Sequence, residues 1–81
     1  MKFEYTKQFT KNYNKAVKGC FSKKIDELLH IVKNNPFEDY PPFKKLYGWQ
    51  YSRRINDQHR LVYDVYEDKV VFLRCWGYYD D

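Results

Sequence analysis

Two runs of strand-forming residues, 49–55 and 59–66, flank a short polar turn at Asn56 and Asp57, and this pattern limits the fold more than any other part of the chain. A third run over residues 70–76 follows a second short turn. Turns this short join antiparallel neighbours. The C-terminal half therefore predicts a small antiparallel sheet.

The N-terminal half predicts a short strand and two amphipathic helices. Phe3 and Tyr5 alternate with a polar residue as in a strand, and the hydroxyl of Thr6 can cap the helix that follows. Gly19 breaks this first helix, and the second helix starts between Cys20 and Ser22. The apolar stripes are Phe9, Tyr13, Ala16 and Val17 in the first helix, and Phe21, Ile25, Leu28, Leu29 and Val32 in the second.

With 81 residues, the chain has room for a single domain, residues 1–81. The expected fold class is α+β, with an N-terminal strand and a helical hairpin packed on a small antiparallel sheet. Alternation places Leu61, Tyr63 and Val65 on the helix side of the sheet and Arg60 on the other side. Residues 36–48 hold the three prolines and predict a stiff loop that frames a site.

Charge and ring content favour an anionic partner. The net charge is +4, and aromatic residues make up 21% of the sequence, more than a thin core needs. Cys20 and Cys75 have neither the spacing of a zinc site nor that of a disulfide scaffold, so we expect two reduced thiols. No signal peptide or membrane-spanning run is visible, and the expected location is the cytoplasm.

The block Ser-Arg-Arg-Ile-Asn-Asp-Gln-His-Arg-Leu-Val-Tyr, residues 52–63, resembles the YoeB/Txe branch of the RelE/ParE toxin superfamily. Pro36-Phe37 upstream and an aromatic pair near the C-terminus extend the resemblance. It implies the toxin of a type II toxin–antitoxin module, an endoribonuclease that enters the ribosomal A site, contacts 16S rRNA and cleaves mRNA. It also implies a cognate antitoxin that masks the site with an acidic and apolar segment, in a toxin–antitoxin hetero-oligomer.

The implied reaction needs neither a metal nor another cofactor. A ribose 2′-hydroxyl attacks the adjacent phosphorus, so the protein must remove one proton, supply another to the leaving 5′-oxygen and neutralise phosphate charge. By position, the resemblance puts Arg60 on the scissile phosphate and Arg54 beside it.

The two acid–base positions of the family are replaced in this chain. Lys44 stands where the resemblance expects a glutamate base, and Tyr78 stands where it expects a histidine acid. A lysine can accept a proton or stabilise charge, and a tyrosine can donate or orient, although a phenol is a weaker acid than an imidazolium. Lys44, Arg54, Arg60 and Tyr78 are therefore the predicted catalytic residues.

Further residues are expected to contact RNA, namely Lys45, Arg53, Trp49 and Tyr79, with packing in the core as an equal alternative for the two aromatic ones. His59 faces away from Arg60 on an ideal strand, so it is expected to be a buried or a partner-facing, hydrogen-bonding residue in preference to a catalytic one. Two other functions stay open. One is a toxin of this type that binds its antitoxin, and the ribosome, without cleavage, and the other is a ParE-like gyrase inhibitor.

Overall fold

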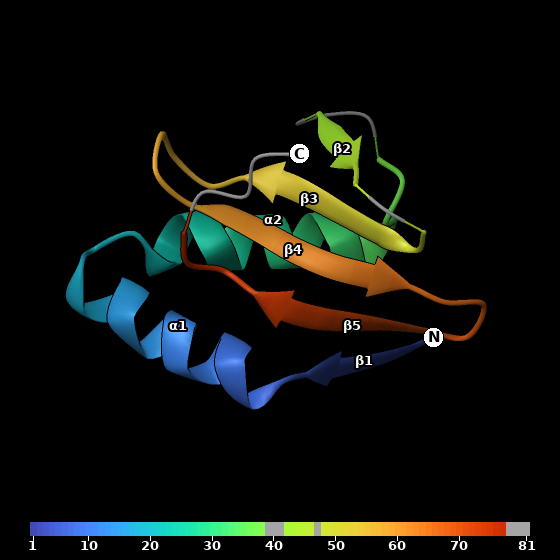
Figure 1. Cartoon of the computed structure of the whole chain (residues 1–81), viewed down its shortest axis with the longest axis horizontal. Helices are drawn as coiled ribbons and strands as arrows, with labels where there is room; N and C mark the ends of the chain where they lie inside the picture. Colours follow the sequence, from blue (N-terminus) through green and yellow to red (C-terminus); the bar gives the residue numbers. More distant parts are fainter. Residues whose placement is uncertain (39–41, 47, 78–81) are drawn as a thin grey trace.

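The computed structural model describes residues 1–38, 42–46 and 48–77 (Figure 1). Its elements follow the chain in the order β1 (Lys2–Tyr5), α1 (Lys7–Lys18), α2 (Ser22–Asn34), β2 (Phe43–Lys45), β3 (Gln50–Arg54), β4 (Arg60–Val65) and β5 (Lys69–Arg74). The predicted α+β class is confirmed, and each predicted helix and strand is present with bounds shifted by one or two residues. None of the helices in these ranges is both long and apolar enough to cross a membrane.

The described strands form one five-stranded sheet in the order β1-β5-β4-β3-β2. The β3–β4 and β4–β5 pairs are antiparallel, as the short turns predict. The β2–β3 pair is also antiparallel, whereas β1 runs parallel to β5. A register shift in the β4–β5 pair brings Arg74 opposite Val62, while Phe72 lies opposite Tyr63. Because cross-strand partners point to the same side of a sheet, this register shift places the Arg74 side chain on the same side as Val62.

The helix α1 begins and ends through local hydrogen bonds. The Thr6 hydroxyl accepts from the backbone N–H of Phe9 at 3.0 Å, which confirms the predicted cap. At the C-terminal end, Phe21 N–H donates to the Ala16 carbonyl and Cys20 N–H donates to the Val17 carbonyl. This is the Schellman arrangement, and its left-handed residue is Cys20 at φ 64°, one position after the glycine expected to break the helix.

The core lies between α2 and the sheet. Figure 1 shows α2 behind the sheet and α1 beside the edge that β5 and β1 form. The predicted inward side chains of β4, Leu61, Tyr63 and Val65, belong to this core. Ile25, Leu28 and Val32 of α2 are also part of it and are buried. The predicted apolar stripe of α2 is therefore confirmed.

Residues 36–48 were predicted to form a loop without regular hydrogen bonding, and this prediction is wrong for Phe43–Lys45. These residues form the edge strand β2, with Lys44 opposite Ser52. The physical reason is that all three prolines precede Phe43. The strand keeps its own N–H groups, and an edge strand needs hydrogen bonds along one side only.

Candidate functional site

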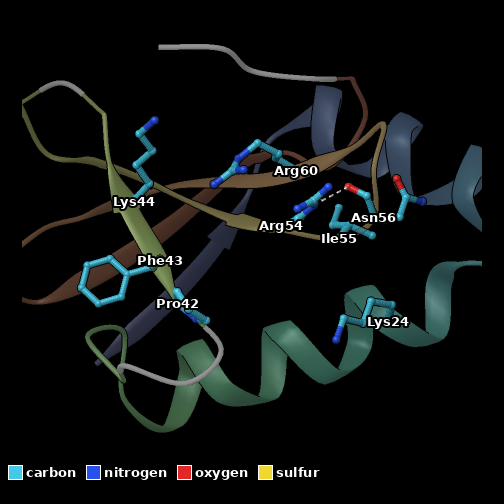
Figure 2. A pocket seen from close by; sticks show the side chains of 8 residues that line it. All are labelled: Lys24, Pro42, Phe43, Lys44, Arg54, Ile55, Asn56 and Arg60. Carbon is cyan, nitrogen blue, oxygen red and sulfur yellow. Dashed lines mark hydrogen bonds between the residues drawn. The ribbon is translucent and has the colours of Figure 1, made fainter.

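A hollow of about 580 Å³ lies where β2, β3 and β4 meet near the side of α2 (Figure 2). Its lining residues are Lys24, Pro42, Phe43, Lys44, Arg54, Ile55, Asn56 and Arg60. We call it the arginine hollow. It brings together three of the predicted catalytic residues, Lys44, Arg54 and Arg60, from three strands. No acidic side chain lines it within the described residues, so it presents concentrated positive charge.

Arg60 is held in place by its neighbours. Its Nε donates to the Ser52 hydroxyl at 3.0 Å, and Ser52 itself is fully buried. The Arg60 backbone N–H donates to the Gly77 carbonyl at 3.1 Å. With one edge of the half-buried guanidinium fixed, the terminal nitrogens point into the hollow (Figure 2). This geometry suits a planar fork that binds phosphate oxygens.

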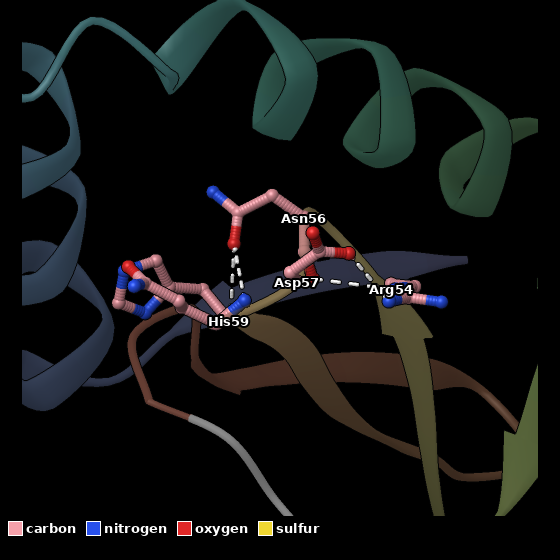
Figure 3. Close-up of polar contacts among 5 residues, drawn as sticks. Arg54, Asn56, Asp57 and His59 are labelled. Carbon is pink, nitrogen blue, oxygen red and sulfur yellow. Dashed lines mark hydrogen bonds and ion pairs between the residues drawn. The ribbon is translucent and has the colours of Figure 1, made fainter.

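Arg54 lies opposite Arg60 in the sheet but has different partners. Its Nη2 contacts Asp57 Oδ1 at 2.6 Å, and its Nε donates to the Asn56 carbonyl at 3.4 Å (Figure 3). The two charged side chains of this ion pair are 63% and 93% exposed. An exposed pair of this kind is worth less than about 1 kcal/mol, so a phosphate can displace the carboxylate.

Lys44 lies on β2 opposite Ser52, which places its side chain on the Arg60 side of the sheet. Lys45 alternates to the other side and does not line the hollow. Trp49, 66% exposed, lines a separate apolar hollow of about 460 Å³ together with Phe37, Tyr51 and Tyr66. The predicted catalytic residue Lys44 therefore belongs to the arginine hollow, and the predicted RNA contacts Lys45 and Trp49 do not line it.

Arg53 was predicted to contact RNA, and the structure contradicts this, because the side chain has no exposed surface. Its Nε donates to the Tyr63 hydroxyl at 3.0 Å, and its Nη2 donates to the carbonyls of Pro36 at 3.2 Å and Glu38 at 2.9 Å. Its guanidinium also lies 5.2 Å from the centre of the Phe43 ring. Alternation turns Arg53 toward the core, where it ties the start of the proline-rich segment to the sheet.

His59 is the buried, hydrogen-bonded histidine that the sequence predicts, with 8% of its surface exposed. Its Nδ1 accepts from the Gly77 N–H at 2.8 Å, and its ring stacks on Phe21 at 4.9 Å between centroids. Burial lowers the pKa of the His59 imidazole below its ordinary value. Asn56 Oδ1 accepts from the backbone N–H of His59 at 2.9 Å and so closes the turn (Figure 3).

Two contributors to the site have no counterpart in the sequence interpretation. Lys24 comes from α2, and only the packing of that helix brings it to the hollow. Ser52 belongs to the block of residues 52–63, and the signal for its own role is its position on β3 beside the Arg54–Arg60 cross-strand pair. Tyr78 and Tyr79 lie outside the described residues, so their roles stay predictions.

Comparison with solved structures defines the class. The chain is similar to the YoeB/ParE toxin from Agrobacterium tumefaciens, with a TM-score of 0.86, 27% identity and coverage of 98% of this chain and 100% of that one. It is also similar to the YoeB dimer from Staphylococcus aureus, with a TM-score of 0.82, 30% identity and 98% coverage of each chain. Two helices and a mostly antiparallel five-stranded sheet thus give this chain the fold of a RelE/ParE-type toxin.

The sequence comparisons give the family. The chain is 38% identical to Toxin YoeB of Escherichia coli (strain K12) over 60 residues, which cover 70% of this chain and 71% of the relative. The family described as YoeB-like toxin of bacterial type II toxin-antitoxin system matches residues 4–79. The chain therefore belongs to the YoeB-like toxins of bacterial type II toxin–antitoxin systems.

Proposed function

We propose that this YoeB-like toxin is an endoribonuclease that cleaves mRNA on the ribosome by attack of a ribose 2′-hydroxyl on the adjacent phosphorus. The observation that carries the proposal is the fixed, half-buried guanidinium of Arg60 at a hollow whose charged lining is entirely cationic in the described residues. Such a donor costs little reorganisation when charge develops on the phosphate.

The roles of the other residues follow from their environments. Arg54 takes a second phosphate oxygen after leaving Asp57, and Lys44 stabilises the developing charge or accepts the 2′-hydroxyl proton. Tyr78 donates to or orients the leaving 5′-oxygen, a role that rests on the family position alone. Lys45, Trp49 and Tyr79 contact RNA outside the arginine hollow.

The proposal includes an antitoxin as partner, since the Staphylococcus aureus relative is solved as a YoeB-YefM complex at a TM-score of 0.79 and 30% identity. An acidic segment of that partner suits the cationic lining of the arginine hollow, and apolar side chains suit the separate hollow around Trp49. The proposed location is the cytoplasm, where ribosomes and mRNA meet.

One observation favours a second candidate, a toxin that binds without cleaving. No carboxylate or imidazole lines the arginine hollow in the part of the chain that the structure describes. The lysine and arginine side chains present there are good phosphate ligands, but they transfer protons less readily near neutral pH than a carboxylate or an imidazole does. In this case the chain would block its target by occupancy.

The test is a comparison of wild type, Arg60→Ala and Arg60→Lys after induction in growing bacteria, with methionine and thymidine incorporation measured over the first minutes. The proposal expects methionine incorporation to fail first and Arg60→Ala to lose the effect, with Arg60→Lys intermediate because it keeps the charge and loses the fork. Prior failure of thymidine incorporation would indicate gyrase inhibition. Full toxicity of Arg60→Ala would overturn the phosphate assignment.

A further inference from the structure

A third hollow, equal in volume to the arginine hollow at about 580 Å³, lies between α1 and the sheet. Its lining includes Gln8 and Lys15 from α1, Gln50 from β3, Arg74 from the end of β5 and Trp76 beyond it. It shares no lining residue with the arginine hollow. We call it the tryptophan hollow.

The charge of the tryptophan hollow is positive. Its ionisable lining residues within the described chain are Lys15 and Arg74, and no carboxylate lines it there. Lys15 belongs to a row of lysines on α1, a helix whose sequence contains no acidic residue; the row is Lys7, Lys11, Lys15 and Lys18. Positive charge therefore continues from the hollow along the helix and attracts an anionic polymer.

Trp76 gives the hollow a fixed aromatic plane. The indole packs on His59 at 4.3 Å and on Phe21 at 5.6 Å between ring centroids, and Lys15 Nζ lies 5.2 Å from its centre. The ring is half-buried and still lines the hollow. The side-chain amides of Gln8 and Gln50 carry both donors and acceptors. An aromatic plane, amides and cations together are what nucleotide recognition uses, whereas an acidic peptide needs the cations alone.

The sheet register connects the two hollows. Arg74 lies opposite Val62, Val62 opposite Ser52, and Ser52 opposite Lys44, so these side chains share one side of the sheet. Ser52 holds Arg60 by its hydroxyl. Because neighbouring strands are about 4.8 Å apart, the β5 and β3 positions of this row are separated by about 10 Å. The side of the sheet that carries Arg60 thus leads directly to Arg74.

The geometry points to a second RNA contact: a single-stranded RNA segment whose phosphate occupies the arginine hollow places a neighbouring nucleotide in the tryptophan hollow. Lys15 and Arg74 neutralise its phosphate, and Trp76 with the glutamine amides receives its base. This inference rests on the proposed function, because it names how the same RNA continues beyond the scissile phosphate.

The test uses a short, fully 2′-O-methylated oligoribonucleotide, which cannot be cleaved, and fluorescence anisotropy over a series of KCl concentrations. Lys15→Gln should weaken binding several-fold and reduce the slope of log K against log[salt] by about 0.7, the value for one phosphate contact on a single strand. The matched control is Lys2→Gln, an exposed lysine at the start of β1. It should leave the salt slope as in wild type.

Further variants test the roles of Arg74 and Trp76 in the tryptophan hollow. Arg74→Gln should act as Lys15→Gln does, and Arg74→Lys should restore most of the salt slope. In a Trp49→Phe background Trp76 is the sole indole, and its emission should be quenched when the oligonucleotide binds. Circular dichroism of each variant separates lost contacts from lost folding.

The inference is overturned if folded Lys15→Gln and Arg74→Gln bind the oligonucleotide with unchanged affinity and salt slope. It is also overturned if they lose affinity for a glutamate-rich peptide and keep affinity for RNA, since the surface would then belong to a protein partner. Cleavage does not enter these binding measurements. A catalytically silent protein would contradict the proposed function and leave this readout intact.

Discussion

Arg54 and Arg60 are cross-strand neighbours with opposite degrees of restraint. Arg60 is held by a buried hydroxyl, and Arg54 is held by a carboxylate in solvent. The first arrangement fixes a side chain in its binding geometry, and the second must be broken before binding. Under the proposed function, the Arg54–Asp57 pair is therefore a small barrier to RNA binding.

Replacing Asp57 with asparagine should strengthen binding of the 2′-O-methyl oligonucleotide by up to about fivefold, because an exposed ion pair is worth up to about 1 kcal/mol. The control is Asp68→Asn, which removes one exposed carboxylate in the β4–β5 turn. Equal gains in the two variants would mean that only net charge matters and that Arg54 makes no specific contact.

His59 gives the fold a dependence on pH. Burial holds the pKa of its imidazole below the unfolded value of about 6.5. The unfolded chain therefore binds the proton more readily, so stability is full above that pH and is lost as pH falls from about 6.5 toward the folded-state pKa. Protonation at Nδ1 also removes the acceptor for the Gly77 N–H.

We expect the free energy of unfolding in urea to fall between pH 7.5 and pH 5.5, by no more than about 1.4 kcal/mol per pH unit for this single proton. His59→Gln should make the decline shallower. His30→Gln removes an exposed histidine and should keep the wild-type decline. A decline that is identical in all three proteins would show that His59 does not cause it.

At the scale of elements, the strand β2 depends on one buried side chain. Arg53 binds the carbonyls of Pro36 and Glu38 and lies against the Phe43 ring, next to Lys44 in the sequence. It therefore sets the path of the segment that leads to Lys44. Its motif neighbour Arg54 has none of these contacts in the described structure.

Arg53→Ala should lower the free energy of unfolding by about 3 kcal/mol, because it removes a large buried side chain and its hydrogen bonds to the Tyr63 hydroxyl and the carbonyls of Pro36 and Glu38. Among the described residues, the Pro36 carbonyl then keeps only the Tyr63 hydroxyl, at 3.4 Å, as a side-chain donor. Arg54→Ala should change stability by less than about 1 kcal/mol. Urea denaturation of both variants measures the difference. Similar small losses would contradict the structural role of Arg53.

At the scale of the whole molecule, the sequence predicts the features that depend on neighbouring residues better than the contacts between distant parts of the chain. The Thr6 cap, the core side of β4 and the buried His59 follow from spacing and alternation, and each is confirmed. The parallel β1–β5 pair joins the two ends of the chain, and no local signal specifies it. Alternation along β3 already turns Arg53 toward the core, and its charge alone led to the wrong assignment. The approach of Lys24 to the arginine hollow depends on the packing of α2, which no local signal specifies.

The arginine hollow and the tryptophan hollow together give the molecule one extended basic surface. The chain has a net charge of +4, and the lysines of α1 together with Arg54, Arg60 and Arg74 lie along or beside the same side of the sheet. A basic surface of this length suits a single strand of RNA, because successive phosphates of the strand lie near cationic side chains. The central claim is that Arg60 is the point on this surface where RNA is cut.

The most direct test of that claim is 5′-end mapping of a reporter mRNA in a reconstituted translation reaction with purified wild-type protein and Arg60→Ala, each with and without ribosomes. The account predicts new 5′ ends that require ribosomes and fall at least about a hundredfold in Arg60→Ala. Wild-type protein that binds ribosomes and produces no cuts would contradict it, as would cuts that persist at full rate in Arg60→Ala.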